Sequence, residues 1–215
     1  MPNTKIKICG ITRGVDAEFA EGAGADFVGV ILAAGFGRTL DVSEAREVMK
    51  DVRRAVRVTV RVDDSYDQIM ADAEVLGAGV VQLHGNEPPE LAARIQEGGH
   101  LVWKAVRVRS GGDLTTAVER FEGAVDGLLL DGWHATRVGG SGTSFPWGDV
   151  APARAQIHEG MGLIAAGGLD PENVAEAIAT LRPTVVDVSS GVEAGMGEKD
   201  PERIRAFVRA VRDRP

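Results

Sequence analysis

The sequence has 215 residues, of which 44% are hydrophobic and 26% charged, and this is the composition and length of a single α/β domain. The formal net charge of −8 argues against a nucleic-acid-binding protein, and no apolar run approaches the roughly 18 residues of a membrane span. One cysteine excludes an internal disulfide framework, and residues 1–7 are polar, without a secretory leader, so we expect a cytoplasmic protein that binds neither nucleic acid nor membrane.

Eight short apolar runs, rich in Val, Ile and Leu, alternate with segments of helical spacing. Continuous apolar runs of this length are typical of parallel strands that are buried on both faces. The sequence therefore predicts eight strands, at 6–9, 27–32, 56–62, 79–84, 101–106, 126–131, 161–166 and 184–189.

Two of the intervening helices have clear start signals. Asp170 precedes Pro171, and Asp200 precedes Pro201, so each aspartate is predicted to cap a helix whose first residue is the proline. After the sixth strand the helical pattern is weak, and 148–160 is the candidate segment.

The repeat of strand and helix predicts the fold class. Eight units in 215 residues leave about 27 residues for each unit, which is enough for a compact crossover. An open doubly wound sheet is the alternative. Because no linker or change of composition divides the chain, we predict a single-domain (β/α)8 TIM barrel over residues 1–215, with the chemistry on the loops that follow the strands.

Several chemistry-bearing residues stand at these strand ends. Cys9 ends the first strand, Arg38 follows the second, His84 ends the fourth and Asp131 ends the sixth. Taken singly, a cysteine here is more often a core residue, an aspartate more often a turn or cap residue, and a histidine more often a hydrogen-bonded structural residue than a substrate contact. The shared rim makes them site candidates. A basic thiolate needs a lowered pKa, which Lys7, Arg38 or backbone donors could supply.

Glycines and serines follow the last two strands. Gly167 and Gly168 come after the seventh strand, and Ser190 and Gly191 come after the eighth. These loops frequently bind phosphate in TIM barrels through their backbone N–H groups. Tight turns are the alternative explanation, and both stay open at this point.

A third glycine-rich segment, residues 138–147, includes Gly142. It does not match a P-loop, because no lysine follows its last glycine. It could be a lid that closes over substrate, or a surface loop. We include Gly142 among the candidate substrate contacts.

The strand-end motifs resemble those of the phosphoribosylanthranilate isomerase family of tryptophan biosynthesis. The resemblance rests on "KICGIT", "VQLHGNE", "LLLD", "GGSGTSFPW", "AAGGLDPENV" and "DVSSGVEAGMGEKD", in the order of the family, from about residue 5 to residue 208. It implies an Amadori rearrangement that needs no cofactor or metal. The substrate would be N-(5-phosphoribosyl)anthranilate, a small phosphorylated sugar joined to anthranilate.

The resemblance also implies roles for individual residues. Cys9 would be the general base and Asp131 the general acid. Arg38 would meet the anthranilate carboxylate. The loops after strands seven and eight, with Gly167, Gly168, Ser190 and Gly191, would hold the phosphate. Relatives occur both as monomers and as homodimers, and the sequence does not choose between them.

Three features depart from the family pattern. The turn 33–38 lacks the Ser-Pro that usually precedes the arginine, so we expect a more flexible turn. The loop "GGSGTS" lacks a lysine that is common there. Arg61 replaces an apolar or aromatic residue, and we expect it to pair with Asp63 or another acid of the rim, since a buried arginine needs a partner.

Two other functions remain as alternatives. The isomerase of histidine biosynthesis runs the same Amadori chemistry, but uses a carboxylate where Cys9 stands, and some dual activity stays open. A second alternative is a non-catalytic relative that binds a phosphorylated ligand. The presence of both Cys9 and Asp131 favours the tryptophan-pathway enzyme.

Overall fold

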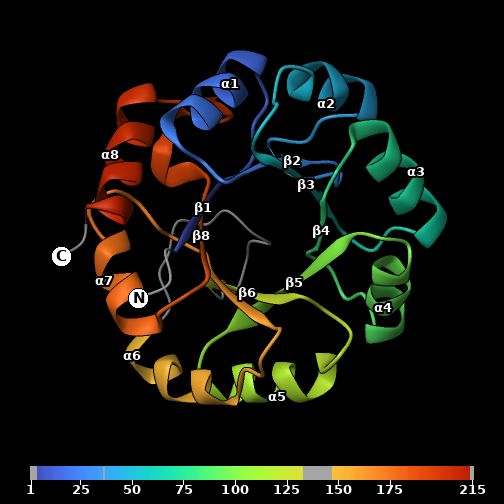
Figure 1. Cartoon of the computed structure of the whole chain (residues 1–215), viewed down its shortest axis with the longest axis vertical. Helices are drawn as coiled ribbons and strands as arrows, with labels where there is room; N and C mark the ends of the chain where they lie inside the picture. Colours follow the sequence, from blue (N-terminus) through green and yellow to red (C-terminus); the bar gives the residue numbers. More distant parts are fainter. Residues whose placement is uncertain (1–3, 36, 133–146, 214–215) are drawn as a thin grey trace.

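A computed structural model of the chain describes residues 4–35, 37–132 and 147–213. Within them, eight parallel strands close into one barrel, in sequence order, so the predicted (β/α)8 barrel is confirmed (Figure 1). The predicted strands are all present and differ from the observed ones only at their ends. The strands are β1 (Lys5–Ile8), β2 (Phe27–Ile31), β3 (Val56–Arg61), β4 (Val80–Leu83), β5 (Leu101–Val108), β6 (Gly127–Gly132), β7 (Gly162–Ala165) and β8 (Val185–Val188).

Helices cover the outside of the barrel, as Figure 1 shows. They are α1 (Gly14–Ala23), α2 (Val42–Met49), α3 (Tyr66–Leu76), α4 (Pro89–Glu97), α5 (Gly111–Phe121), α6 (Trp147–Val150), α7 (Val174–Leu181) and α8 (Pro201–Arg212). The weak segment after β6 forms only the short α6 and a 3₁₀ helix, Ala151–Gln156.

The predictions that Asp200 and Asp170 each cap a helix had different outcomes. Asp200 caps α8 as predicted, and its side chain accepts hydrogen bonds from the N–H groups of Glu202 and Arg203. The prediction for α7 was wrong, because that helix begins at Val174 after Asn173. Asp170 instead binds the N–H groups of the turn before the helix, which keeps this loop close to the barrel rim.

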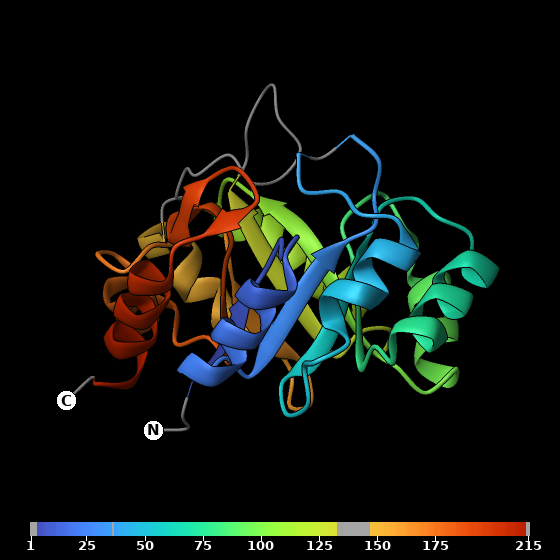
Figure 2. The same cartoon turned by 90° about the horizontal axis from the view of Figure 1, so that it is seen from above.

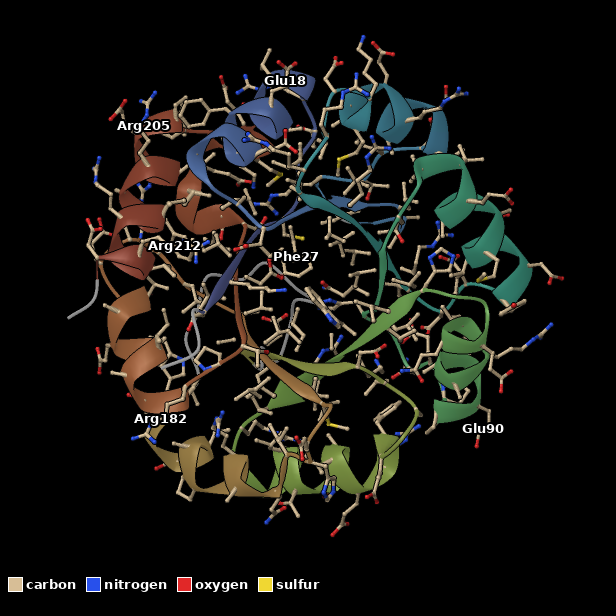
Figure 3. The ribbon with its side chains drawn as sticks, in the orientation of Figure 1. Glu18, Phe27, Glu90, Arg182, Arg205 and Arg212 are labelled. Atoms are coloured by element: carbon tan, nitrogen blue, oxygen red, sulfur yellow. The ribbon has the colours of Figure 1, made fainter. Side chains whose placement is uncertain are left out.

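Apolar side chains form two layers on either side of the strands. The outer layer joins the barrel to the helices. The inner layer fills the barrel and includes Phe27, near the centre of Figure 3, whose ring packs edge-on against Trp103 at 4.9 Å between ring centroids. Charged side chains such as Glu18, Glu90 and Arg205 point outward from the helices. The barrel is therefore a packed core, and polar chemistry is left to its rim.

The first and last strands of the barrel close it with a buried ion pair. β1 and β8 pair in parallel, and Lys7 lies opposite Asp187. Lys7 is 0% exposed, and its Nζ lies 2.8 Å from Oδ2 of Asp187. Side chains alternate along a strand, so Cys9 and Lys7 share one face of β1, toward the barrel interior.

A small hairpin follows the barrel. After a 3₁₀ turn, Ser190–Val192, the strands β9 (Glu193–Gly195) and β10 (Glu198–Lys199) pair antiparallel. Figure 2 shows this hairpin at the end of the barrel opposite both chain termini. Thr12 donates a hydrogen bond to the carbonyl of Gly197, which ties the hairpin to the loop after β1. Among the described helices, none combines the length and apolar character that spanning a bilayer requires.

Candidate active site

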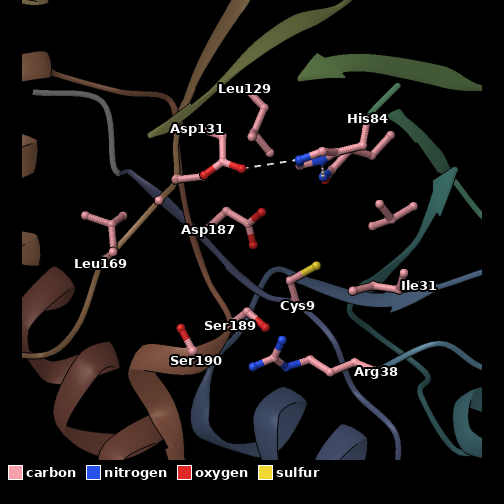
Figure 4. A pocket seen from close by; sticks show the side chains of 15 residues that line it. Cys9, Ile31, Arg38, His84, Leu129, Asp131, Leu169, Asp187, Ser189 and Ser190 are labelled. Atoms are coloured by element: carbon pink, nitrogen blue, oxygen red, sulfur yellow. Dashed lines mark hydrogen bonds and ion pairs between the residues drawn. The ribbon is translucent and has the colours of Figure 1, made fainter. Parts of the chain in front are cut away.

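A pocket opens at the carboxyl ends of the strands, on the rim where the sequence places the candidate residues. Figure 4 shows Cys9, Arg38, His84, Asp131 and Ser190 around it. Within residues 4–35, 37–132 and 147–213, the lining is formed by Cys9, Ile31, Arg38, Val60, Gln82, His84, Leu129, Asp131, Ala166, Gly167, Gly168, Leu169, Asp187, Ser189 and Ser190. Seven separate strand ends contribute to this lining, so the pocket exists only once the barrel is closed.

Cys9 lies at the base of the pocket. It is 6% exposed, and its backbone N–H donates to the carbonyl of Val188, at 2.8 Å. A Cβ at Gly29 would lie 3.2 Å from Sγ of Cys9 and 3.4 Å from Nζ of Lys7, so the thiol and the ammonium meet over a residue that has no side chain. Gly29 makes room for this arrangement.

The charges around Cys9 oppose one another. Burial raises the pKa of the Cys9 thiol, and Asp187 adds to this effect, while the ammonium groups of Lys7 and Lys199 act against it. Burial alone would lower the pKa of Lys7, but Asp187 and Cys9 raise it above the ordinary value, so Lys7 is a cation at neutral pH. Burial therefore favours the neutral thiol, and Lys7 and Lys199 are the cations that favour the thiolate.

Asp131 forms one end of a hydrogen-bonded chain whose other members are Gln82, on β4, and His84, the residue that follows β4. Its Oδ2 lies 3.3 Å from Nε2 of His84, and Nδ1 of His84 lies 3.1 Å from Nε2 of Gln82 (Figure 4). Oε1 of Gln82 is buried and has no hydrogen-bond partner among the described residues. Turning the Gln82 amide would let this oxygen accept from Nδ1–H of His84, and Nε2 would then accept a proton from Asp131.

The loop after β7 approaches Asp131 closely. Gly167 and Gly168 both have positive φ, +75° and +69°. A Cβ at Gly167 would lie 2.5 Å from the backbone nitrogen of Gly132 and 2.8 Å from Oδ1 of Asp131, so glycine is needed there. Among the described residues, none accepts a hydrogen bond from the N–H groups of Gly167 or Gly168. These donors are available to an anion.

The loop after β8 completes this side of the pocket, and it includes one expected residue that does not line it. Ser189 and Ser190 line the pocket. Gly191 is not among the lining residues, and a Cβ there would overlap the carbonyl of Leu169. Gly191 therefore allows the loops after β7 and β8 to pack together.

Arg38 reaches the pocket from the loop after β2, and it is held there by a carboxylate. Its Nε and Nη2 both lie 2.6 Å from the two carboxylate oxygens of Glu193. Its stem lies over Gly10, where a Cβ would be 2.6 Å from Cδ of Arg38. The loop itself is held by a hydrogen bond from Oγ1 of Thr39 to the carbonyl of Ala33, at 2.5 Å.

Arg61 does not reach the pocket, and of its predicted partners, Asp63 or another acid of the rim, the structure shows the second, Asp64 in the loop after β3. Val60 lines the pocket, so the next residue of β3 faces the helices. The guanidinium of Arg61 donates to Asp64 at 2.8 Å and to Asp72 at 2.6 Å. Asp63 instead accepts from the N–H of Asn86. Arg61 is absent from the pocket lining, so its charge is balanced outside the site.

Other features of the sequence bear on the site less directly. Gly142, with the loop proposed as a lid, lies outside the described residues. In residues 4–35, 37–132 and 147–213, no group of three or more His, Cys, Asp or Glu side chains is arranged to hold a metal ion.

Sequence reasoning missed some residues that shape the site. Asp187 lines the pocket, and the alternation along β8 with Ser189 could have indicated this. Glu193 and Lys199 lie in the hairpin and within the motif "DVSSGVEAGMGEKD", but that motif does not indicate that the segment folds back toward the loop after β2.

Comparison with known proteins places the chain in a family. A model of the family described as N-(5'phosphoribosyl)anthranilate (PRA) isomerase matches residues 6–210. The chain belongs to this family. A curated relative named N-(5'-phosphoribosyl)anthranilate isomerase, from Chromohalobacter salexigens, is 43% identical over 213 residues, which cover 98% of this chain and 95% of the relative.

Solved structures agree with this family and with the barrel. Phosphoribosyl anthranilate isomerase from Thermotoga maritima superposes with a TM-score of 0.88 at 37% identity, over 98% of this chain and 99% of that one. A second PRA isomerase structure, in complex with reduced 1-(o-carboxyphenylamino)-1-deoxyribulose 5-phosphate, gives a TM-score of 0.85 at 36% identity, with the same coverage. The predicted resemblance and the predicted isomerase class are confirmed.

Proposed function

We propose that this chain converts N-(5-phosphoribosyl)anthranilate into 1-(2-carboxyphenylamino)-1-deoxyribulose 5-phosphate, the Amadori rearrangement of tryptophan biosynthesis, with Asp131 as general acid and Cys9 as general base. The observation that carries this proposal is that both side chains line one pocket, from strands β6 and β1, beside two loops suited to phosphate. Family membership supports the substrate.

In the first step, Asp131 gives a proton to the ring oxygen of the furanose. The C1′–O bond breaks, and the anthranilate nitrogen supplies the electron pair that forms the Schiff base. Asp131 must be protonated to do this. The hydrogen-bonded chain through His84 to Gln82 supports that state. With the Gln82 amide turned, its oxygen accepts from Nδ1–H of His84, and Nε2 of His84 then accepts a hydrogen bond from the protonated carboxyl group of Asp131.

In the second step, Cys9 acts as a thiolate, after its thiol proton has passed to solvent, and removes the proton from C2′. The electron pair forms the enol, which then becomes the ketone at C2′, so the product has the same composition as the substrate. Lys7 stabilises the thiolate from below, since its ammonium is fully buried and adjacent to Cys9. Each positioned acid or base contributes on the order of 10²–10⁴ in rate.

Binding uses groups at two ends of the substrate. The N–H groups of Gly167 and Gly168 and the hydroxyl of Ser190 bind the phosphate. Arg38, from the loop after β2, binds the anthranilate carboxylate, because a planar guanidinium matches the geometry of a carboxylate. Both contacts lie away from the reacting carbons, and the binding energy from such contacts positions the sugar between Asp131 and Cys9.

The test generates the labile substrate in situ and follows the loss of anthranilate fluorescence. Wild type should turn over, while Asp131→Asn and Cys9→Ala should each lose about 10²–10⁴ in kcat and keep binding inorganic phosphate. Asp67→Asn is the matched control, because Asp67 is exposed and does not line the pocket. Full turnover by Cys9→Ala, or no turnover by folded wild type, would refute the proposal.

A further inference from the structure

We propose that Glu193 is a positioning residue that fixes the guanidinium of Arg38 for the substrate carboxylate, and so determines the affinity for the anthranilate end of the substrate. This inference rests on the proposed function, which gives Arg38 that contact. Glu193 does not line the pocket itself, so it reaches the substrate only through Arg38.

Arg38 and Glu193 form a bidentate ion pair, which we call the clamp. Both oxygens of Glu193 accept from Arg38, each at 2.6 Å, through Nε and Nη2. Two parallel hydrogen bonds fix the plane of the guanidinium as well as its distance. The side chains are 13% exposed for Arg38 and 6% for Glu193. Nη1 of Arg38 takes no part in this clamp, so its two N–H groups, and the second N–H of Nη2, are left for a ligand.

The loop that carries Arg38 does not orient it in the same way. Residues 33–38 include two alanines and two glycines, and Gly35 has a φ of +88° with no neighbouring heavy atom near its Cβ position. The hydrogen bond from Thr39 to Ala33 closes this turn, but it holds the backbone and not the guanidinium of Arg38. The orientation of Arg38 therefore comes from Glu193, on a hairpin far along the chain, and from Gly10 beneath the stem.

Lys199 offsets the negative charge of Glu193, so that the positive charge of Arg38 remains available to an anionic ligand. Its Nζ lies 2.8 Å from Oε1 of Glu193 and is 0% exposed. Two cations share one carboxylate, so the group formed by Arg38, Glu193 and Lys199 has a formal charge of +1. Lys199 also donates to the carbonyl of Ser189, at 3.1 Å. The clamp is thus attached to the loop that contains Ser190 without using its backbone donors.

Glu193→Asp tests the clamp at constant charge. The shorter side chain withdraws the carboxylate by one methylene, so it cannot contact both Arg38 and Lys199 as before. We expect KM to rise about 5- to 30-fold with kcat within about 3-fold, because an unclamped arginine loses side-chain entropy on binding. Binding of inorganic phosphate should stay unchanged. Glu198→Asp is the matched control, since Glu198 lies on the same hairpin but pairs with Arg13.

Arg38→Ala separates the inference from the proposal on which it rests. We expect this variant to raise KM, and Glu193→Asp to have little further effect when added to it. If Arg38→Ala leaves KM unchanged, the role of Arg38 itself is wrong. If Arg38→Ala raises KM but Glu193→Asp does not, the clamp is refuted alone. An equal loss of phosphate binding in Glu193→Asp would also refute it, because Glu193 would then only support the loop.

Discussion

Replacing Cys9 by alanine should change how the stability of the protein depends on pH in the alkaline range. The folded protein holds the thiol proton more tightly than the unfolded chain, because burial raises the pKa of Cys9 above its ordinary value of 9.0. Above that value the unfolded thiol ionises first. The unfolded state then binds fewer protons than the folded one, so rising pH favours unfolding.

The size of this effect follows from proton linkage. The stabilisation from Cys9 is complete below pH 9.0 and is lost as the pH rises toward its folded pKa. One proton gives a slope of about 1.4 kcal/mol per pH unit at most. Lys7 adds a second loss of the same sign, but it begins only above 10.5. Lys104 and Lys199 have lowered pKa values and act in the opposite direction. The difference between wild type and Cys9→Ala reports the thiol together with its interactions with Lys7 and Lys199, whose own pKa values Cys9 raises.

Chemical denaturation of both proteins from pH 7 to pH 10.5 measures this difference. The free energy of unfolding of wild type minus that of Cys9→Ala should be constant up to about pH 8.5 and fall above pH 9. Because the chain has one cysteine, the difference in ultraviolet absorbance between wild type and Cys9→Ala reports the same titration, with the absorbance of the single tyrosine cancelling. Parallel curves, or a native thiolate that forms below pH 9, would show that burial does not control this thiol.

Three further substitutions test other parts of the structure. Gly167→Ala should cost about 1–2 kcal/mol for its left-handed backbone and lower kcat as well, because its Cβ would press on Asp131. Arg61→Met should destabilise the fold by about 3–5 kcal/mol, because it leaves Asp72 buried without its ion pair, while kinetics of the folded enzyme stay unchanged. Asp200→Ala should cost about 1 kcal/mol through the lost cap of α8.

The substitutions of Gly167 and Arg61 each have a control elsewhere in the chain. Gly148→Ala introduces a Cβ into open space, so it should leave kcat unchanged. Arg54→Met removes a guanidinium whose side chain is 76% exposed, and should change stability by less than about 0.5 kcal/mol. Denaturation curves and steady-state kinetics provide both measurements. Equal effects of the paired substitutions would contradict the assigned contacts, and so would unchanged kcat in Gly167→Ala or altered kinetics in Arg61→Met.

The barrel and the rim could be predicted because their signals are local. Each strand is a continuous apolar run, and in a parallel barrel all strand ends meet on one rim. Cys9, Arg38, His84 and Asp131 were therefore expected to lie together, and they line one pocket. Their roles in the reaction stay predictions.

The rest depended on contacts between distant segments. The direction of Arg61 could have been inferred from the alternation with Val60, but its partner Asp72 depends on how α3 packs. The start of α7 moved from Pro171 to Val174 because Asn173 and Asp170 form their own hydrogen-bonded turn. Glu193 lies 155 positions from Arg38, and only the folded hairpin brings the two together.

The ion pair between the first and last barrel strands also has a consequence during synthesis. Lys7 and Asp187 are 180 positions apart, so the ammonium leaves the ribosome long before its counter-ion is made. Until β8 emerges, β1 has one unpaired edge and the barrel cannot close. The thiol of Cys9 is then exposed on the side that β8 covers, and the loop with Ser190 is missing. Contacts of such long range form late in folding. We therefore expect nascent chains that stop before β8 to be wholly inactive, and to depend on protection of the exposed edge of β1.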